Sequence, residues 1–239
     1  MPIRWSLPGE CWVCRGHCRL VFLFIRSGFF VVMQKQKVKM MANKKKIKMA
    51  TFHEIRFHGR GGQGTVSAAA LMALAAFEGG FESQAFPKFG SERRGAPVEA
   101  YVRISQSEIR THNQVYTPDA VVIQDAGLLR SEPLLRGLKQ GGLVILNSEQ
   151  LPDNIDNQET RFRWICLPAS HIGERHLGRP LPNTVLLGAL AAATQWVSLS
   201  ALEQAVTNHL SSKGSEMVKA NIEALREGYQ SVSQQEEAS

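Results

Sequence analysis

The stretch of sequence that decides the fold is FHEIRFHGRGGQGTVSAAALMALAAF, residues 52–77. Residues 52–58 alternate polar and apolar side chains and are rich in strand formers, which predicts a half-buried β-strand. A glycine-rich loop follows at 59–64. Residues 65–77 are then rich in alanine and leucine with an apolar stripe at helical spacing, and a glycine pair ends the helix. The order strand, glycine loop, helix indicates an α/β fold.

The glycine loop is a candidate anion-binding site. Gly59, Gly61 and Gly64 match the pattern G-x-G-x-x-G between a strand and a helix. Glycines let the backbone turn tightly and approach a ligand, and the helix N-terminus offers free N–H groups to a phosphate. The alternative is that these glycines only permit a tight turn and close helix–sheet packing. The binding hypothesis takes in the whole loop: Gly59, Arg60, Gly61, Gly62, Gln63 and Gly64.

A dinucleotide site would need one further residue. Rossmann folds that bind such cofactors place an acid about 20 residues further on, at the end of the second strand. Glu82 lies near that distance, but it begins the strand expected at 81–86 rather than ending it. The pattern therefore disfavours an NAD or FAD site.

The rest of the chain alternates strands and helices and then becomes helical. Residue patterns predict strands at 81–86, 98–104, 119–125, 143–146 and 161–167, and helices at 127–140, 169–177, 184–196, 199–210 and 215–229. This order predicts a three-layer α/β fold. It consists of an open, mostly parallel Rossmann-like sheet with helices on both faces and a helical C-terminal part.

Charge and cysteine divide the chain into two unlike parts. The formal net charge is +7, but residues 1–49 carry +10 and residues 50–239 carry −3. Three of the four cysteines lie in the first part, and only Cys166 lies in the second. The mildly acidic body lacks the basic surface of a nucleic-acid-binding protein. With one cysteine it has no disulfide framework, which fits a cytoplasmic protein.

The composition predicts a disordered or non-native leader at 1–49, one domain at 50–230 and a frayed tail at 231–239. The leader's cysteines have the spacing C-x2-C-x3-C, which lacks the further ligands of iron–sulfur or zinc motifs, so we expect no metal there. The apolar run at 20–33 is too short to span a bilayer as a helix, so we expect no membrane contact. We expect the natural chain to start at a later methionine, which would be Met33, Met40, Met41 or Met49. The alternative is that the leader is a natural, disordered extension.

A second candidate site is the loop FPKFGSERRGAP at 86–97. Arg93 and Arg94 are adjacent there and are able to hold a phosphate or carboxylate bidentately. The alternative is a solvated loop in which Glu92 pairs with them. Further along the chain, Asn183 and Thr184 begin a predicted helix, where an asparagine is more often an N-cap than a ligand contact.

Three segments together make the body resemble a known family. They are GRGGQG at 59–64, FPKFGSERRGAP at 86–97 and NTVLLGA at 183–189. Their combination and order are similar to the gamma subunit, or gamma domain, of the pyruvate:ferredoxin oxidoreductases, within the 2-oxoacid:acceptor oxidoreductase family. The resemblance covers about residues 53–230 and none of the leader. The string at 90–97 resembles the pyruvate-type gamma chains, although Ser91 replaces their usual proline.

The resemblance implies a role in a larger complex. Such complexes oxidise pyruvate with coenzyme A to acetyl-CoA and CO2 and pass electrons to ferredoxin or flavodoxin. Thiamine diphosphate with Mg lies between alpha and beta subunits, and [4Fe-4S] clusters lie on other chains, including a ferredoxin-like delta subunit. This chain has no thiamine-diphosphate signature, no ferredoxin-type cysteine run and no recognisable nucleophile–base pair. We therefore expect a required, non-catalytic subunit that is inactive alone, aids assembly and binds no cofactor by itself.

The same resemblance makes the two loops candidates for the phosphate end of coenzyme A, with Asn183 and Thr184 as weaker candidates. The loops could instead pack against the alpha subunit. Two other functions stay open. One is the equivalent subunit of an indolepyruvate or 2-oxoglutarate oxidoreductase, and the other is a free-standing dinucleotide-binding oxidoreductase.

Replacing Arg93 and Arg94 together by glutamine is expected to raise the KM for coenzyme A if they hold phosphate, because a charged hydrogen bond contributes about 1.5–3 kcal/mol. Steady-state kinetics of the intact complex measure this. An unchanged KM in a fully assembled complex would remove these two residues from the coenzyme A site.

Overall fold

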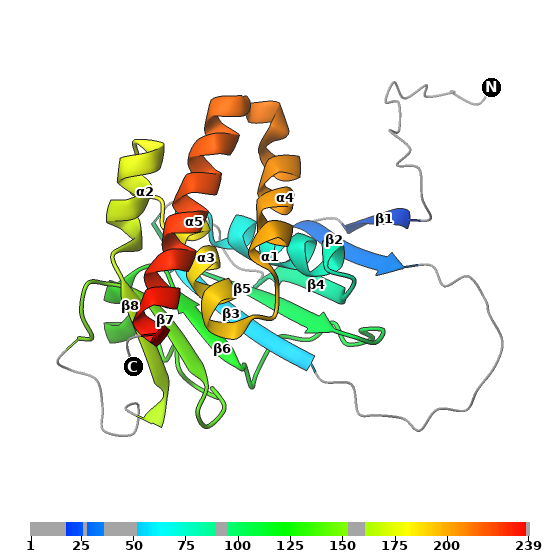
Figure 1. Ribbon diagram of the computed structural model, residues 1–239. Coiled ribbons are helices and arrows are strands. Elements are labelled where there is room, and N and C mark those ends of the chain that lie inside the picture. Colours follow the sequence, from blue (N-terminus) through cyan, green and yellow to red (C-terminus); the bar gives the residue numbers. More distant parts are fainter. Residues whose placement is uncertain (1–17, 26–27, 36–51, 89–94, 153–160, 238–239) are drawn as a thin grey trace, which may run out of the picture.

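The computed structural model describes residues 18–25, 28–35, 52–88, 95–152 and 161–237. Within these residues the strands form one sheet in the order β1-β2-β4-β5-β3-β6-β7-β8 (Figure 1). Residues 89–94 and 153–160 lie outside this description. The structure therefore does not test the predictions for Glu92, Arg93 and Arg94.

The glycine loop leaves from the middle of the sheet. The central strand β3 (Phe52–Arg60) pairs in parallel with β6 (Ala120–Ile123), which pairs in parallel with β7 (Leu143–Asn147) and through it with β8 (Arg163–Leu167). On its other side β3 pairs antiparallel with β5 (Pro97–Ser105).

The strand β4 (Glu82–Pro87) pairs antiparallel with β5 and therefore runs the same way as β3. Among the strands β3 to β8, only β5 runs in the opposite direction, so the predicted mostly parallel sheet is confirmed. The α/β fold and the helical C-terminal part are confirmed as well.

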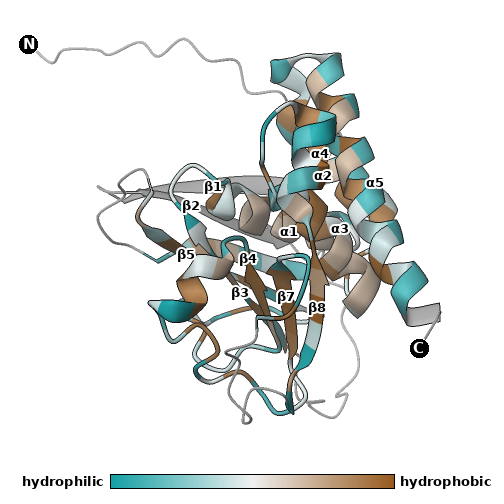
Figure 2. Ribbon diagram, turned by 90° about the vertical axis from the view of Figure 1, so that its left-hand side faces the viewer, coloured by the Kyte–Doolittle hydropathy of each residue, from teal (hydrophilic) through white to brown (hydrophobic). Residues whose placement is uncertain are grey.

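Five α-helices cover one face of the sheet (Figure 1). They are α1 (Thr65–Glu78), α2 (Ala169–Leu177), α3 (Asn183–Thr194), α4 (Leu199–Leu210) and α5 (Ser215–Glu237). Helix α3 is buried along most of its length, because it lies between the sheet and α5. In Figure 2 the outer helices α4 and α5 show both polar and apolar residues, as expected for helices with one solvent face.

The opposite face carries less helix than the sequence predicts. The helix expected at 127–140 is a short 3-10 helix, η1 (Ala126–Arg130), followed by turns. Pro133 lacks the N–H that a continuing helix needs, and Gly137 has a φ of 78°, outside the helical range. The leucines of this segment still bury against β6 and β7: Leu128, Leu134, Leu135 and Leu138. The third layer is therefore present but largely irregular.

Two further elements were not predicted. In the leader, which we expected to be disordered or non-native, β1 (Cys18–Ile25) and β2 (Gly28–Lys35) form an antiparallel pair that adds to the edge of β4. The apolar and aromatic residues of this run favour strands. At the other end, α5 was expected to stop at residue 229 but continues to Glu237. No Gly or Pro interrupts it there, and Val232 is fully buried.

The contact of α3 with α5 depends on two glycines. A Cβ on Gly188 would lie 2.0 Å from the backbone oxygen of Leu225, and a Cβ on Gly228 would lie 2.1 Å from that of Val185. Because both obstacles are backbone atoms, neither can yield without moving a helix. The two helices can lie this close only without side chains at these positions.

Replacing Gly188 by alanine is therefore expected to lower the free energy of unfolding by about 2 kcal/mol, the cost of overpacking, although alanine is the better helix former. Chemical denaturation measures the change. The comparison is Gly178→Ala, since Gly178 has open space around it, so that alanine there adds only the backbone strain of a φ of 64° and should cost less than overpacking. A Gly188→Ala variant as stable as the unchanged protein would contradict this close packing.

Candidate functional site

The first glycine of the loop is required by packing. Gly59 lies near the end of β3, where a Cβ would come within 2.3 Å of Thr65 Oγ1 and 2.6 Å of Gln124 Oε1. These two atoms are themselves hydrogen-bonded at 2.8 Å. The contact brings the start of α1 against the end of β6. Gly59 is therefore needed for packing, whether or not the loop also binds a ligand.

The last glycine of the loop brings two helix N-termini together. Gly64 is the N-cap of α1, has a φ of 75° and provides no side-chain cap. A Cβ there would lie 2.7 Å from Nδ2 of Asn183, the first residue of α3. The N-termini of α1 and α3 therefore meet at the carboxyl end of β3. Both present backbone donors and the positive end of a helix dipole at one place.

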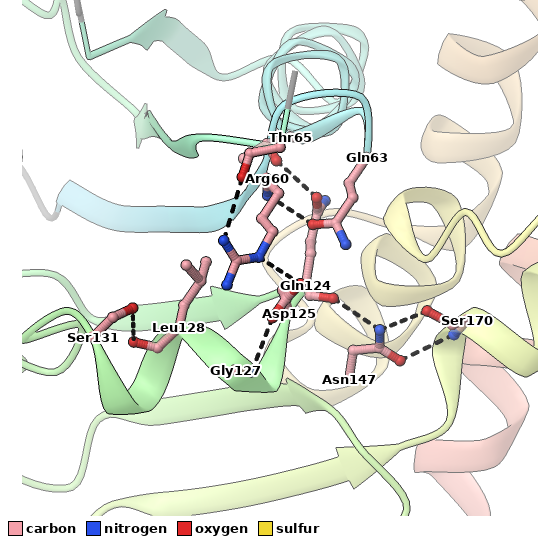
Figure 3. Close-up of polar contacts among 11 residues, drawn as sticks. Arg60, Gln63, Thr65, Gln124, Asp125, Gly127, Leu128, Ser131, Asn147 and Ser170 are labelled. Carbon is pink, nitrogen blue, oxygen red and sulfur yellow. Dashed lines mark hydrogen bonds and ion pairs between the residues drawn. The ribbon is translucent and has the colours of Figure 1, made fainter. Parts of the chain in front are cut away.

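Arg60 and Gln63 hold the loop in shape. The Arg60 amide donates to Gln63 Oε1 at 2.7 Å, and the Gln63 amide donates to the Arg60 carbonyl at 3.0 Å. Arg60 Nε donates to Asp125 Oδ2 at 2.9 Å, and its Nη1 donates to the Gly95 carbonyl at 3.3 Å (Figure 3). Its guanidinium is only partly buried. It thus stands at the solvent edge of the loop, already paired with an acid.

The structure ties the two predicted loops to each other. The Gly61 amide donates to the Ala96 carbonyl at 2.9 Å, and the Gly95 amide donates to the Gly61 carbonyl at 3.1 Å. Segments about 35 residues apart in sequence therefore lie side by side. Glu92, Arg93 and Arg94 lie just before Gly95 but outside the described residues.

Thr184 is placed differently from the other candidates. Its side chain is 1% exposed, and its hydroxyl donates to Asn221 Oδ1 on α5 at 3.0 Å. This contact joins α3 to α5, so the hydroxyl is committed to packing.

A polar network that was not predicted from the sequence continues along the same edge of the sheet (Figure 3). Asn147, at the end of β7, donates to the Gln124 carbonyl at 2.8 Å and to Ser170 Oγ at 2.7 Å, and it accepts from the Ser170 amide at 3.0 Å. Gln124 follows β6 and is fully buried. A polar residue at the end of an apolar strand is the signal by which Gln124 and Asn147 could have been found.

The edge so assembled has the character of a binding surface. It joins the carboxyl ends of β3, β6 and β7, where ligands of open α/β sheets usually bind. It offers backbone donors, amide side chains and one guanidinium. In the part of the chain that the structure describes, no cluster of three or more His, Cys, Asp or Glu residues is arranged to hold a metal.

The comparisons with known proteins agree with this fold. The family model described as pyruvate ferredoxin/flavodoxin oxidoreductase matches residues 54–231. The chain belongs to this family, and the resemblance found from its three motifs is confirmed.

Individual relatives give the same result. Pyruvate synthase subunit PorC of Methanothermobacter thermautotrophicus is 46% identical over 179 residues, which cover 75% of this chain and 95% of that protein. The common gamma subunit of the pyruvate/ketoisovalerate oxidoreductases of Thermococcus litoralis is 44% identical over 179 residues, with 74% and 95% covered. The crystal structure of pyruvate oxidoreductase subunit PORC from Thermotoga maritima has a TM-score of 0.63 and 36% identity, covering 75% of this chain and 96% of that one.

The helices were also compared with the requirements for a membrane-spanning segment. Among the described residues, no helix combines the length and the apolar character needed to cross a bilayer.

His58, which precedes the loop, makes the stability of the fold depend on pH. Burial lowers the pKa of His58 from 6.5 to about 4, although Glu99 acts to raise it. Between these two pKa values His58 is protonated in the unfolded chain and neutral in the folded chain. The free energy of unfolding is therefore unaffected by His58 above pH 6.5 and decreases as the pH falls toward 4.

Lowering the pH from about 7 to about 4.5 is therefore expected to reduce the free energy of unfolding by about 2 kcal/mol through this residue alone. Denaturation curves of the His58→Gln variant should lack that part of the pH dependence. The control is His209→Gln, since His209 is exposed on α4. Equal pH dependence in both variants would show that His58 is not the titrating group.

Proposed function

We propose that this chain is the gamma subunit of a pyruvate:ferredoxin, or flavodoxin, oxidoreductase complex. The complex converts pyruvate and coenzyme A to acetyl-CoA and CO2 and passes the electrons to ferredoxin or flavodoxin. The observation that carries the proposal is the match to relatives named as pyruvate synthase and pyruvate oxidoreductase subunits over nearly their whole length. The subunit takes part in assembly and in binding coenzyme A, and it is inactive alone.

The proposal leaves the redox chemistry to partner subunits. Thiamine diphosphate with Mg and the [4Fe-4S] clusters would lie on alpha, beta and ferredoxin-like delta subunits. A [4Fe-4S] cluster needs four thiolates, whereas residues 50–239 contain one cysteine, Cys166. This thiol is half-buried, and burial raises its pKa, so it is a poor thiolate ligand.

The glycine loop is the proposed binding surface for the phosphate end of coenzyme A. The N-termini of α1 and α3 meet at Gly64 and Asn183 and favour a negative charge there. Arg60 supplies a cation at the edge of this surface. The hydrogen bonds between Gly61 and residues 95–96 bring the end of the second loop to the same place. A phosphate there would meet both motifs.

A second candidate is the same role in a complex for another 2-oxoacid. The relative from Thermococcus litoralis is named as a subunit common to pyruvate and ketoisovalerate oxidoreductases. A subunit shared by two such enzymes does not by itself select the acid. We therefore assign the choice of 2-oxoacid to the partner subunits.

The subunit role is tested by anaerobic purification of the tagged chain from its own cells, followed by mass analysis and assays with several 2-oxoacids. Recovery with a thiamine-diphosphate-binding partner and an iron–sulfur partner, with coenzyme A-dependent oxidation of pyruvate, is expected. Oxidation of another 2-oxoacid in preference would favour the second candidate. Recovery of the chain alone would contradict both and favour a free-standing protein.

The coenzyme A surface is tested by Arg60→Gln in the complex. Loss of a charged hydrogen bond of about 1.5 kcal/mol should raise the KM for coenzyme A by about tenfold and leave the KM for pyruvate unchanged. The matched control is Arg226→Gln, because Arg226 is also a surface arginine with one acidic partner, Glu203, but lies on α5. A KM for coenzyme A that rises equally in both variants would contradict a specific role for Arg60.

A further inference from the structure

A cavity of about 810 Å³ lies on the face of the sheet opposite the five helices. Arg56 and His58 of β3 line it, since they alternate with Ile55 and Phe57, which pack toward the helices. Glu99 and Tyr101 of β5 form the neighbouring wall, and residues 114–116 and 132–137 complete it. The cavity is distinct from the glycine loop, which projects beyond the end of β3.

Two buried side-chain nitrogens of residues that line this cavity lack partners. Arg56 and His58 are each 7% exposed, and among the described residues neither Arg56 Nε nor His58 Nε2 has a hydrogen-bond partner. Arg56 Nη2 donates to the Leu134 carbonyl, which holds the guanidinium in place. Its Nε remains without a hydrogen-bond partner. A buried polar group without a partner is costly, and a native fold that keeps two side by side calls for an acceptor between them.

The charges around the cavity favour an anionic acceptor. Its cations are Arg56, Lys88 and Arg136, and its acids are Glu99 and Glu132. Lys88 Nζ binds Glu99 Oε2 at 3.0 Å, whereas Arg56 Nε is 4.0 Å from Glu99 Oε1, beyond hydrogen-bond distance. Burial works to raise the pKa of Glu99, but the hydrogen bond from Lys88 and the nearby charges hold it below its ordinary value. Glu99 is thus ionised and shared between Lys88 and the more distant Arg56, and the cavity lining carries one more cation than acid.

We propose that this cavity binds an organic anion whose carboxylate or phosphate oxygens accept hydrogen bonds from Arg56 Nε and His58 Nε2. The Arg56 Nε can only donate, and a guanidinium binds oxyanions more strongly than neutral acceptors. A lone phosphate or carboxylate would fill little of the volume. The remaining walls include the apolar residues Val98, Val115 and Leu134, which suit the carbon skeleton of a larger molecule.

The test uses the intact complex and two probes, inorganic phosphate and acetate, with chloride at equal ionic strength as the reference. Hydrogen–deuterium exchange at the imidazole C2 position, followed by mass spectrometry, reports the protonation of His58 and is measured above about pH 5.5, where both probes are anions and the acid loss of stability expected toward pH 4 is avoided. An anion beside the ring stabilises its charged form, so bound probe should raise the pKa of His58 above its value of about 4. A saturable rise with phosphate alone identifies a phosphate site, and a rise with acetate identifies a carboxylate site.

Variants tie the effect to the cavity. Arg56→Met should raise the half-saturating concentration of the effective probe by about tenfold or more, because one charged hydrogen bond is lost. Because Arg56 is buried and this variant is at risk of misfolding, Lys88→Met provides a second test at an exposed position. The control is Arg130→Met, which removes the same charge from the exposed part of η1, outside the cavity.

The outcomes are distinct. The proposal is supported if the half-saturating concentration of the probe rises in Arg56→Met or Lys88→Met and does not rise in Arg130→Met. The proposal is overturned if neither probe changes the His58 titration beyond the effect of chloride, since the donors would then face water only. It is also overturned if all three variants respond equally. Neither result depends on whether coenzyme A binds at the glycine loop.

Discussion

The structure depends on the absence of a side chain at Gly59. Thr65 Oγ1 and Gln124 Oε1 occupy the space that a Cβ would need, so the strand β3, the helix α1 and the end of β6 meet at a single point. From this contact the chain must leave β3 in a tight turn, and the turn directs the N-terminus of α1 toward that of α3. A packing constraint and a binding surface thus arise from the same glycine loop.

The family assignment and the fold support each other. The family match over residues 54–231 spans the sheet from β3 to β8 and the helices that cover it. The polar network of Gln124, Asn147 and Ser170 extends the same edge over three parallel strands. Such an edge can contact a ligand and a partner subunit at once.

Local signals in the sequence predicted most of the fold but not its far face. The strand β3 and the helix α1 were predictable from the spacing of their apolar residues, and β6 from its continuous apolar run, because these signals are local in the sequence. The segment at 127–140 has a helical pattern too, but Pro133 and the positive φ of Gly137 interrupt it. At the site, the glycine pattern identified Gly59 and Gly64. The pairing of Gly61 with Ala96 and the cavity at Arg56 and His58 could not be predicted, since they depend on strand register and on contacts distant in sequence.

The proposed contact between the glycine loop and coenzyme A is tested by amide hydrogen exchange of the intact complex, with and without coenzyme A. If the contact exists, residues 61–64 and the start of α3 exchange more slowly when coenzyme A is bound, and the distant helix α4 does not change. Unchanged exchange at the loop, together with protection confined to other subunits, would contradict it.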